Sequence, residues 1–211
     1  MKKLFTSDKF FLAMVLCAVI GEAAYIYIDL SVYHYAIQER FALIFRVLCV
    51  IFLYVSYRKH SKNTMKGLMG ALLGAQMITA IQYLSDITTL VECICVPAFA
   101  ICSGLLFVNH FIINSDHHAN PKMIFMNQIL VGLLFLADAV WLISWGVSLH
   151  SAVMWVTVVL DVIGSLGMTA IIVCVESRLD AYRLNREAAG WTEKMGYPEG
   201  YVHEYQKTDN Q

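Results

Sequence analysis

Long apolar runs separated by short polar connections dominate the sequence. Each run is close to the roughly 20 residues that an α-helix needs to cross the hydrocarbon core of a bilayer. The pattern predicts an all-α, polytopic membrane protein whose six transmembrane helices are arranged as three hairpins. The predicted helices cover residues of about 10–29, 38–57, 65–84, 90–113, 123–146 and 152–177.

The composition agrees with this pattern. Of the 211 residues, 59% are apolar and only 15% are charged, whereas about a quarter of a soluble domain is charged. The lipid bilayer is therefore the first expected partner of the chain. The formal net charge of −1 hides a strong alternation of charge along the sequence.

Basic residues gather in every second connection between the predicted helices. Such an excess marks the cytoplasmic loops of membrane proteins, and an even number of spans agrees with it, so both termini are predicted to be cytoplasmic. No N-x-S/T sequon occurs, which favours the inner membrane of a bacterium as the location in the cell. The basic residues are Lys2, Lys3, Lys9, Arg58, Lys59, Lys62, Lys66, Lys122, Arg178, Arg183 and Arg186.

A polar C-terminal segment, residues 178–211, follows the predicted membrane domain at 1–177. Opposite charges at helical spacing between Glu176 and Ala189 predict that the sixth helix continues into the cytoplasm. Gly190 and the cluster of Gly196, Pro198 and Gly200 are expected to end regular structure. The rest of this tail is expected to be irregular and is too short to form an enzyme domain. It could lie on the membrane surface or bind a cytoplasmic protein.

Three carboxylates lie inside the apolar runs: Glu22, Asp138 and Asp161. A charged side chain at the centre of a membrane helix costs about 2.5 kcal/mol or more, so it normally faces a partner or a water-filled cavity. A rise of 1.5 Å per residue places these acids, with Gln76 and Arg46, at a similar depth in the outer half of the bilayer. Arg46 is the one cation well inside a predicted span, and it either pairs with one of the acids or extends to the outer headgroups.

Helical spacing extends these positions into polar and aromatic stripes, which should face the interior because lipid cannot satisfy them. Carboxylates beside aromatic rings suit a cation or an amine, through charge pairing and cation–π contact. The stripes are Glu22–Tyr25–Asp29, Gln76–Thr79–Tyr83, Asp138–Trp141–Trp145 and Asp161–Ser165–Thr169. The predicted ligand-binding residues are Glu22, Tyr25, Arg46, Gln76, Asp138, Trp141, Asp161 and Ser165.

Small residues predict close contacts between helices, at Gly164 and Gly167 and at the G-x-x-x-G of residues 70–74. The latter motif also suggests a homodimer, although it is common in membrane helices. Pro97 is expected to kink the fourth predicted helix.

The spacing of the cysteines and histidines does not indicate a metal site or a redox site. The six cysteines form neither a C-x-x-C pair nor a zinc pattern, and His110, Asp116, His117 and His118 match no zinc signature. No metal site or catalytic residue is predicted, and no cofactor is identified.

Three functions remain open from the sequence. The first is a transporter-like or channel-like protein that binds and translocates a small molecule or cation at the acidic pocket. The second is a membrane sensor or regulatory subunit that signals to a cytoplasmic partner through the last helix. The third is an intramembrane lipid-modifying enzyme, in which paired acids act on a lipid or a prenyl group. It is the least favoured, because the sequence lacks the aspartate-rich or His/Asp/Ser constellations that such enzymes use. No basic arm indicates nucleic-acid binding.

Overall fold

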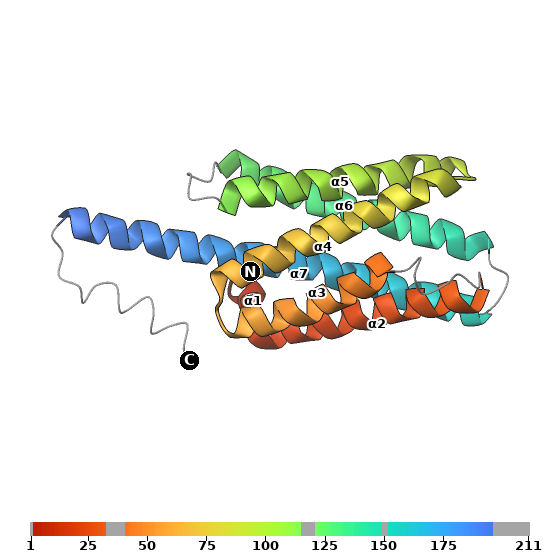
Figure 1. Cartoon of the computed structure of the whole chain (residues 1–211), viewed down its shortest axis with the longest axis horizontal. Coiled ribbons are helices and arrows are strands. Elements are labelled where there is room, and N and C mark those ends of the chain that lie inside the picture. Colours follow the sequence, from red (N-terminus) through yellow and green to blue (C-terminus); the bar gives the residue numbers. More distant parts are fainter. Residues whose placement is uncertain (1, 33–40, 115–120, 149–151, 196–211) are drawn as a thin grey trace.

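The computed structural model describes residues 2–32, 41–114, 121–148 and 152–195 (Figure 1). Within these ranges all regular structure is helical, which confirms the all-α prediction. The elements are α1 (Lys2–Phe5), α2 (Asp8–Val32), α3 (Phe41–Arg58), α4 (Lys62–Tyr83), η2 (Leu84–Asp86), α5 (Leu90–Asn114), α6 (Pro121–Ser148) and α7 (Ala152–Met195).

Five of the six long helices are long and apolar enough to cross a membrane. The qualifying segments are Asp8–Tyr27, Phe41–Arg58, Leu90–His110, Phe125–Ser144 and Trp155–Tyr182. Helix α4 is not among them, because Lys66, Gln76 and Gln82 lower its hydropathy. Its role as a sixth span therefore stays a prediction.

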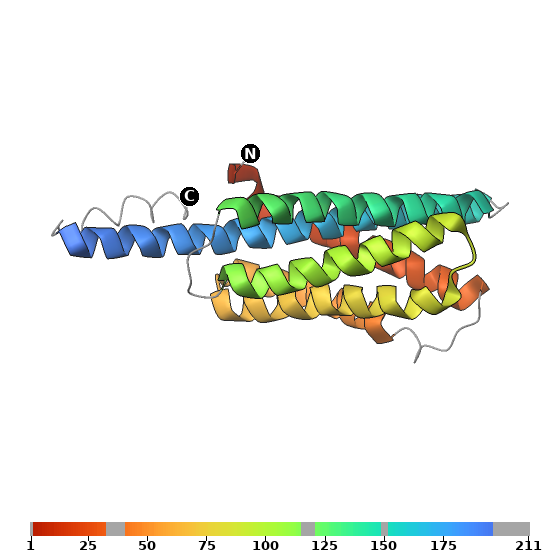
Figure 2. The same cartoon turned by 90° about the horizontal axis from the view of Figure 1, so that it is seen from above.

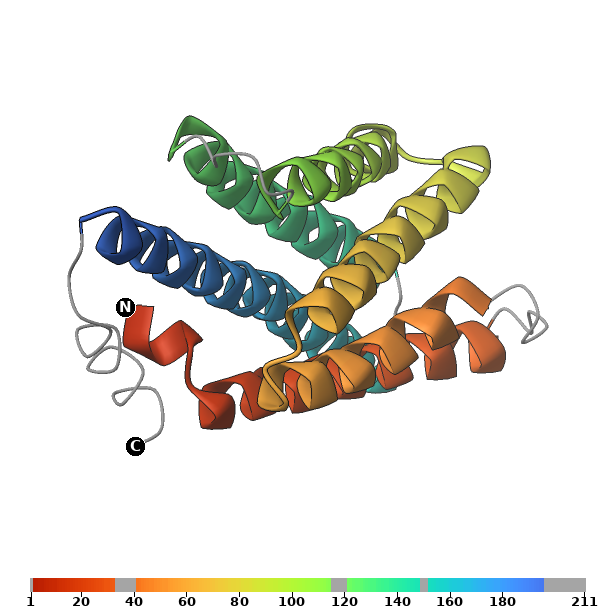
Figure 3. The same ribbon diagram turned by 60° about the vertical axis from the view of Figure 1, so that its left-hand side comes forward.

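The helices pack as a ring in chain order. Each of α2 to α7 packs against its neighbours in the sequence, and α7 closes the ring by packing against α2. Figure 3 shows this arrangement obliquely. Among the described helices, the contact between α2 and α7 is the most extensive and exceeds that between α2 and α3. The predicted grouping into three hairpins is therefore not confirmed.

Apolar side chains cover the outside of the bundle as well as its core. Phe52, Ile101 and Val159 are among many large apolar residues that are exposed. Buried polar side chains, such as those of Gln76 and Asn127, lie inside instead. A protein in water keeps polar groups outside, whereas lipid cannot satisfy them. The arrangement therefore supports a multi-pass membrane protein.

Glycines allow α2 and α7 to touch backbone to backbone. A methyl group added at Gly21 would collide with the backbone of Gly164, and one added at Gly167 would lie 2.8 Å from the carbonyl oxygen of Met14 and from the amide nitrogen of Ala18. The predicted close packing at Gly164 and Gly167 is confirmed, while Gly21 had no such prediction. This contact fixes the separation of the two helices.

The G-x-x-x-G motif of α4 has a partner inside the chain. A methyl group added at Gly74 would make ordinary contact, at 3.7 Å, with the ring of Phe107 on α5, whereas Gly67 faces open space. The homodimer suggested by this motif stays a prediction.

Helix α5 starts at a capping box and runs through a proline. The carboxylate of Glu92 accepts hydrogen bonds from the backbone N–H of Thr88 (2.8 Å) and of Thr89 (2.9 Å), and the Thr89 hydroxyl accepts one from the backbone N–H of Glu92 (3.2 Å). These bonds satisfy amides that have no partner within the helix. Pro97 lies inside α5, which continues past it as one helix.

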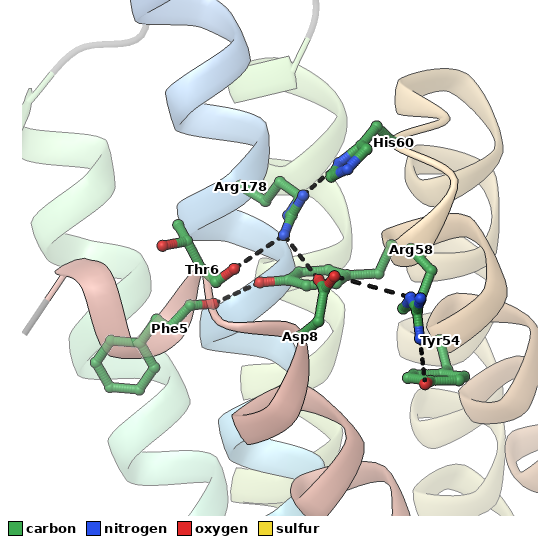
Figure 4. A network of polar contacts seen from close by, with 8 residues as sticks. Phe5, Thr6, Asp8, Tyr54, Arg58, His60 and Arg178 are labelled. Atoms are coloured by element: carbon green, nitrogen blue, oxygen red, sulfur yellow. Dashed lines mark hydrogen bonds and ion pairs between the residues drawn. The ribbon is translucent and has the colours of Figure 1, made fainter. Parts of the chain in front are cut away.

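A polar network at one end of the bundle ties α7 to the start of α2 and the end of α3 (Figure 4). Arg178 donates from Nη2 to the carbonyl oxygen of Thr6 (2.9 Å) and to Oδ1 of Asp8 (3.1 Å), and its other terminal nitrogen contacts Nδ1 of His60. Its guanidinium carbon also lies 3.9 Å from the centre of the Tyr57 ring. We call these residues the Arg178 network.

Helix α7 projects beyond the bundle past this network (Figures 1 and 2). Gly190 does not end regular structure as predicted, because α7 is continuous through it to Met195. The second predicted end, the cluster of Gly196, Pro198 and Gly200, lies outside the described residues. A glycine within a helix costs only about 1 kcal/mol relative to alanine, which the flanking residues can offset. The predicted irregular tail beyond residue 195 lies outside the described residues.

Candidate functional site

A small cavity lies between all six long helices. Its volume is about 30 Å³. Since a water molecule needs roughly 10–15 Å³ of such space, about two waters would fill it. The lining residues are Glu22, Tyr25, Leu43, Arg46, Thr79, Ala80, Tyr83, Phe99, Asp138, Trp141, Leu142, Asp161, Gly164 and Ser165.

The cavity lies toward the end of the bundle opposite the Arg178 network. Arg46 is near the start of α3, Asp161 is near the start of α7, and Tyr83 is the last residue of α4. At 1.5 Å per residue, Asp161 and Arg178 are separated by about 25 Å along α7. One continuous helix therefore joins the two polar regions.

An ion pair between Glu22 and Arg46 connects α2 to α3 at the cavity. Their side chains are only 8% and 11% exposed. Of the two interpretations of Arg46, the structure shows pairing with an acid. Pairing of this kind makes the burial of both charges tolerable. Removal of either partner would leave the other buried without a compensating charge.

A hydrogen bond between α7 and α6 holds the second carboxylate. The Ser165 hydroxyl donates to Oδ2 of Asp138. Asp161 lies one turn before Ser165 on the same face of α7 and is 9% exposed. The two aspartates thus reach the cavity from adjacent helices.

Three aromatic side chains form one wall of the cavity. The Tyr25 hydroxyl donates to the Tyr83 hydroxyl at 2.6 Å. The Tyr83 ring meets Trp141 edge to face, with ring centres 5.1 Å apart and planes inclined by 65°. These contacts join α2, α4 and α6 and place aromatic rings among the residues that line the cavity with the carboxylates.

The charges around the cavity do not cancel. Three carboxylates and one guanidinium line it, so two formal negative charges are left over. The buried Nε of Arg46 makes no hydrogen bond to any described residue. Among the residues that the structure places, no group of three His, Cys, Asp or Glu side chains is arranged to hold a metal ion.

Seven of the eight predicted site residues line this cavity: Glu22, Tyr25, Arg46, Asp138, Trp141, Asp161 and Ser165. Gln76 does not line it. It is buried within the bundle, and Thr79 and Tyr83 from the same predicted stripe line the cavity instead. The apolar lining residues Leu43, Phe99 and Leu142 were not predicted, because nothing in the sequence distinguishes them from other core positions.

A second buried polar cluster lies nearer the Arg178 network. The Asn109 amide donates to the Asn127 carbonyl (3.0 Å), and the Asn127 amide donates to the Glu176 carboxylate (3.2 Å). These bonds join α5, α6 and α7. This cluster was not predicted, although a carboxylate and two amides in or beside apolar runs are visible in the sequence.

Comparison of the chain with protein-family models, with curated proteins and with solved structures gives no match. The function must therefore be inferred from the cavity itself.

Proposed function

We propose that this protein is a transporter-like membrane protein that binds a small cation in the acidic, aromatic-walled cavity and translocates it. The observation that carries the proposal is the excess of carboxylates over guanidinium groups in one buried cavity. An intramembrane acid that faces a cavity commonly marks a substrate or ion pathway. The adjacent π-electron density favours cations further.

The membrane arrangement that we propose has six spans with both termini in the cytoplasm. Helix α4 packs between α3 and α5 and has 22 residues, which corresponds to about 33 Å at 1.5 Å per residue, close to the thickness of a bilayer core. In this orientation the basic connection between α3 and α4 and the Arg178 network face the cytoplasm, and the cavity lies in the outer half. An inner-membrane location in a bacterium remains part of the same proposal.

Translocation requires that the cavity open alternately to the two sides. All six long helices contribute lining residues, so a shift of any one of them changes the cavity. We propose that α2 and α7, which touch without intervening side chains at Gly21 and Gly164, slide over each other. Small sliding motions of packed helices are an established route to domain rearrangement.

The test is cation uptake into proteoliposomes with Asp138→Asn and Asp161→Asn. Each substitution removes one negative charge and keeps the shape of the side chain. We expect at least a ten-fold loss of uptake in both. Asp180→Asn, on α7 outside the cavity, is the matched control and should transport like the unaltered protein. Unchanged uptake in both cavity variants would contradict the proposal.

A sensor is the second candidate, favoured by one observation. Helix α7 runs without interruption from Asp161 at the cavity to Met195 beyond the bundle, so a change at the cavity could reach a cytoplasmic partner through it. The test is co-purification of proteins from the source membrane with the full chain and with a chain that lacks residues 184–211. This truncation keeps the Arg178 network intact. An identical set of bound proteins counts against the sensor.

A further inference from the structure

We infer that Glu176 is a proton-binding site, and that a proton bound there loosens the contact between α6 and α7. The site lies toward the end of the bundle that carries the Arg178 network, which the proposed orientation places in the cytoplasm. The proton site depends only on the contacts of Glu176. Its effect on translocation rests on the proposed function, because it concerns the opening of the cavity toward the cytoplasm.

The contact between α6 and α7 holds two carboxylates, one at each end. Asp138 of α6 accepts a hydrogen bond from Ser165 of α7, and Glu176 of α7 accepts one from Asn127 of α6. The two bonds are 11 residues apart on both helices, from 127 to 138 and from 165 to 176, which is about 16 Å. Eleven residues make almost three full turns, so all four side chains lie on the contacting faces.

Apolar side chains separate these two bonds. Leu134 of α6 and Ile172 of α7 are buried between them. Direct proton transfer requires a hydrogen bond or a single bridging water, so Glu176 does not exchange protons with Asp138 over this distance. Glu176 exchanges them with the nearer end of the bundle, where Asp180 follows one turn later on α7.

No cation pairs with Glu176 among the residues that the structure places. Arg178 is engaged in its own network, and the His110 ring hydrogen-bonds to the backbone of Lys66. The groups that act on Glu176 are the neutral amide of Asn127 and the like charge of Asp180. An acid in such surroundings favours uptake of a cation, and the smallest cation is a proton. The charged and titratable residues of the surrounding helices are Asp180 and Arg178 on α7, Lys122 on α6, His110 on α5, Lys66 on α4 and Asp8 on α2.

The amides beside Glu176 favour a proton over a metal ion. Asn127 directs its N–H group to Oε1 of Glu176, while its carbonyl oxygen accepts from the Asn109 amide. The amide oxygen that could bind a metal ion is therefore already engaged. Hard metal ions take several oxygen ligands at once, about six or more for Ca²⁺. A proton needs one oxygen, and Oε2 of Glu176 accepts no hydrogen bond from a described residue.

A proton on Oε2 changes the strength of the contact between the helices. The ionised carboxylate accepts a charge-assisted hydrogen bond from Asn127, which is roughly twice as strong as a bond between neutral groups. Formation of the O–H bond takes up one proton and removes the negative charge, so only the weaker bond is left. Asn127 also accepts the bond from Asn109 of α5. The neutral acid therefore loosens α5, α6 and α7 at the end where they must separate for the cavity to open inward.

The first experiment detects the proton itself. Infrared difference spectra of the purified full-length protein in detergent are recorded during a pH titration, and the signal is the C=O stretching band of a protonated carboxyl group. We expect one such band to grow as the pH falls, to be absent in Glu176→Gln and to remain in Asp180→Asn. Glu176→Gln keeps an oxygen that accepts from Asn127, so the fold is retained. Glu176→Asp, which brings back a carboxyl group, should restore a band.

The same titration tests a metal ion as the ligand. Replacement of choline chloride by sodium chloride or potassium chloride, at constant pH and ionic strength, should leave the band unchanged. Loss of the band in either salt would overturn the inference, because the site would then bind a metal ion. A band that persists in Glu176→Gln would overturn it as well.

The second experiment measures the effect on α6. Hydrogen exchange of residues 121–130, at the start of α6, is corrected for the intrinsic pH dependence of exchange. It should become at least three-fold faster when the unaltered protein is acidified. In Glu176→Gln, which mimics the neutral acid, exchange should be fast at every pH. An equal response to pH in both proteins would overturn the loosening of the helices.

The outcomes separate this inference from the proposed function. If Asp138→Asn abolishes cation uptake while no band depends on Glu176, transport stands and the proton site is wrong. A Glu176 band together with the exchange response supports the proton site even where no cation is taken up, and only the proposed transport then fails.

Discussion

The contact between Gly21 and Gly164 makes the sharpest prediction about stability. Gly21→Ala adds one methyl group at the point where α2 and α7 touch. Besides its collision with the Gly164 backbone, the added carbon would lie 2.9 Å from the Gly164 nitrogen and 3.0 Å from the Leu160 carbonyl oxygen. Ordinary contacts at such positions begin at 3.4 Å, and the collision with the Gly164 Cα is the closest of the three, so the helices must separate by about 1 Å.

The magnitude follows from two opposing effects. Overpacking of a tight contact typically costs about 1–3 kcal/mol. Replacement of glycine by alanine inside a helix stabilises it by about 1 kcal/mol, because less backbone entropy is lost on folding. Since backbone atoms, which cannot rotate away, form this contact, we expect overpacking to prevail. A backbone contact puts the overpacking cost at the upper end of its range, so the net loss should be about 2 kcal/mol, or roughly 4–8 °C in Tm for a chain of this size.

The assay is thermal unfolding in detergent, with Gly67→Ala as the matched control. Gly67 lies in α4, where an added methyl group meets nothing within 4 Å. Only the entropic effect then acts, so the same substitution should leave the Tm unchanged or raise it. Gly21→Ala should also weaken cation binding, because Glu22 follows directly in the chain and would move away from α7.

Equal shifts of the Tm in the same direction for Gly21→Ala and Gly67→Ala would contradict this expectation. That result would mean that α2 and α7 do not touch at these glycines.

Three further predictions concern other contacts. Arg46→Leu should destabilise the protein by about 3–5 kcal/mol, since Glu22 is then buried without its cation. In unfolding measurements in detergent, the double variant Arg46→Leu/Glu22→Gln should recover most of this loss. If the losses of the two single variants simply add in the double variant, the ion pair does not stabilise the protein. Arg178→Ala should open the end of the bundle and increase the rate of maleimide labelling of the buried Cys174 at least ten-fold, as measured by mass spectrometry. An unaltered labelling rate would show that the Arg178 network does not shield this thiol. Thr89→Ala should remove the cap of α5 at a cost of about 1 kcal/mol, seen as faster hydrogen exchange in its first turn, and unchanged exchange there would contradict the capping role.

The sequence predicted the helices and their inward faces because both follow from local rules. The length of an apolar run sets the length of a helix, and helical spacing places side chains three and four residues apart on one face. Lipid cannot satisfy a carboxylate, so the faces with Glu22, Asp138 and Asp161 had to turn inward. Pairing of Arg46 with a buried acid was one of the two predicted alternatives, because lipid cannot satisfy a guanidinium group either.

The tertiary structure alone decided how these faces meet. Periodicity fixes a direction on one helix but neither its rotation against another helix nor the distance between them. Gln76 was therefore expected at the site, while the packing of α4 places Thr79 and Tyr83 there. The closure of the ring by α2 and α7, and with it the 30 Å³ volume of the cavity, depends on backbone contact between Gly21 and Gly164. These residues lie far apart in the chain, and no local pattern links them.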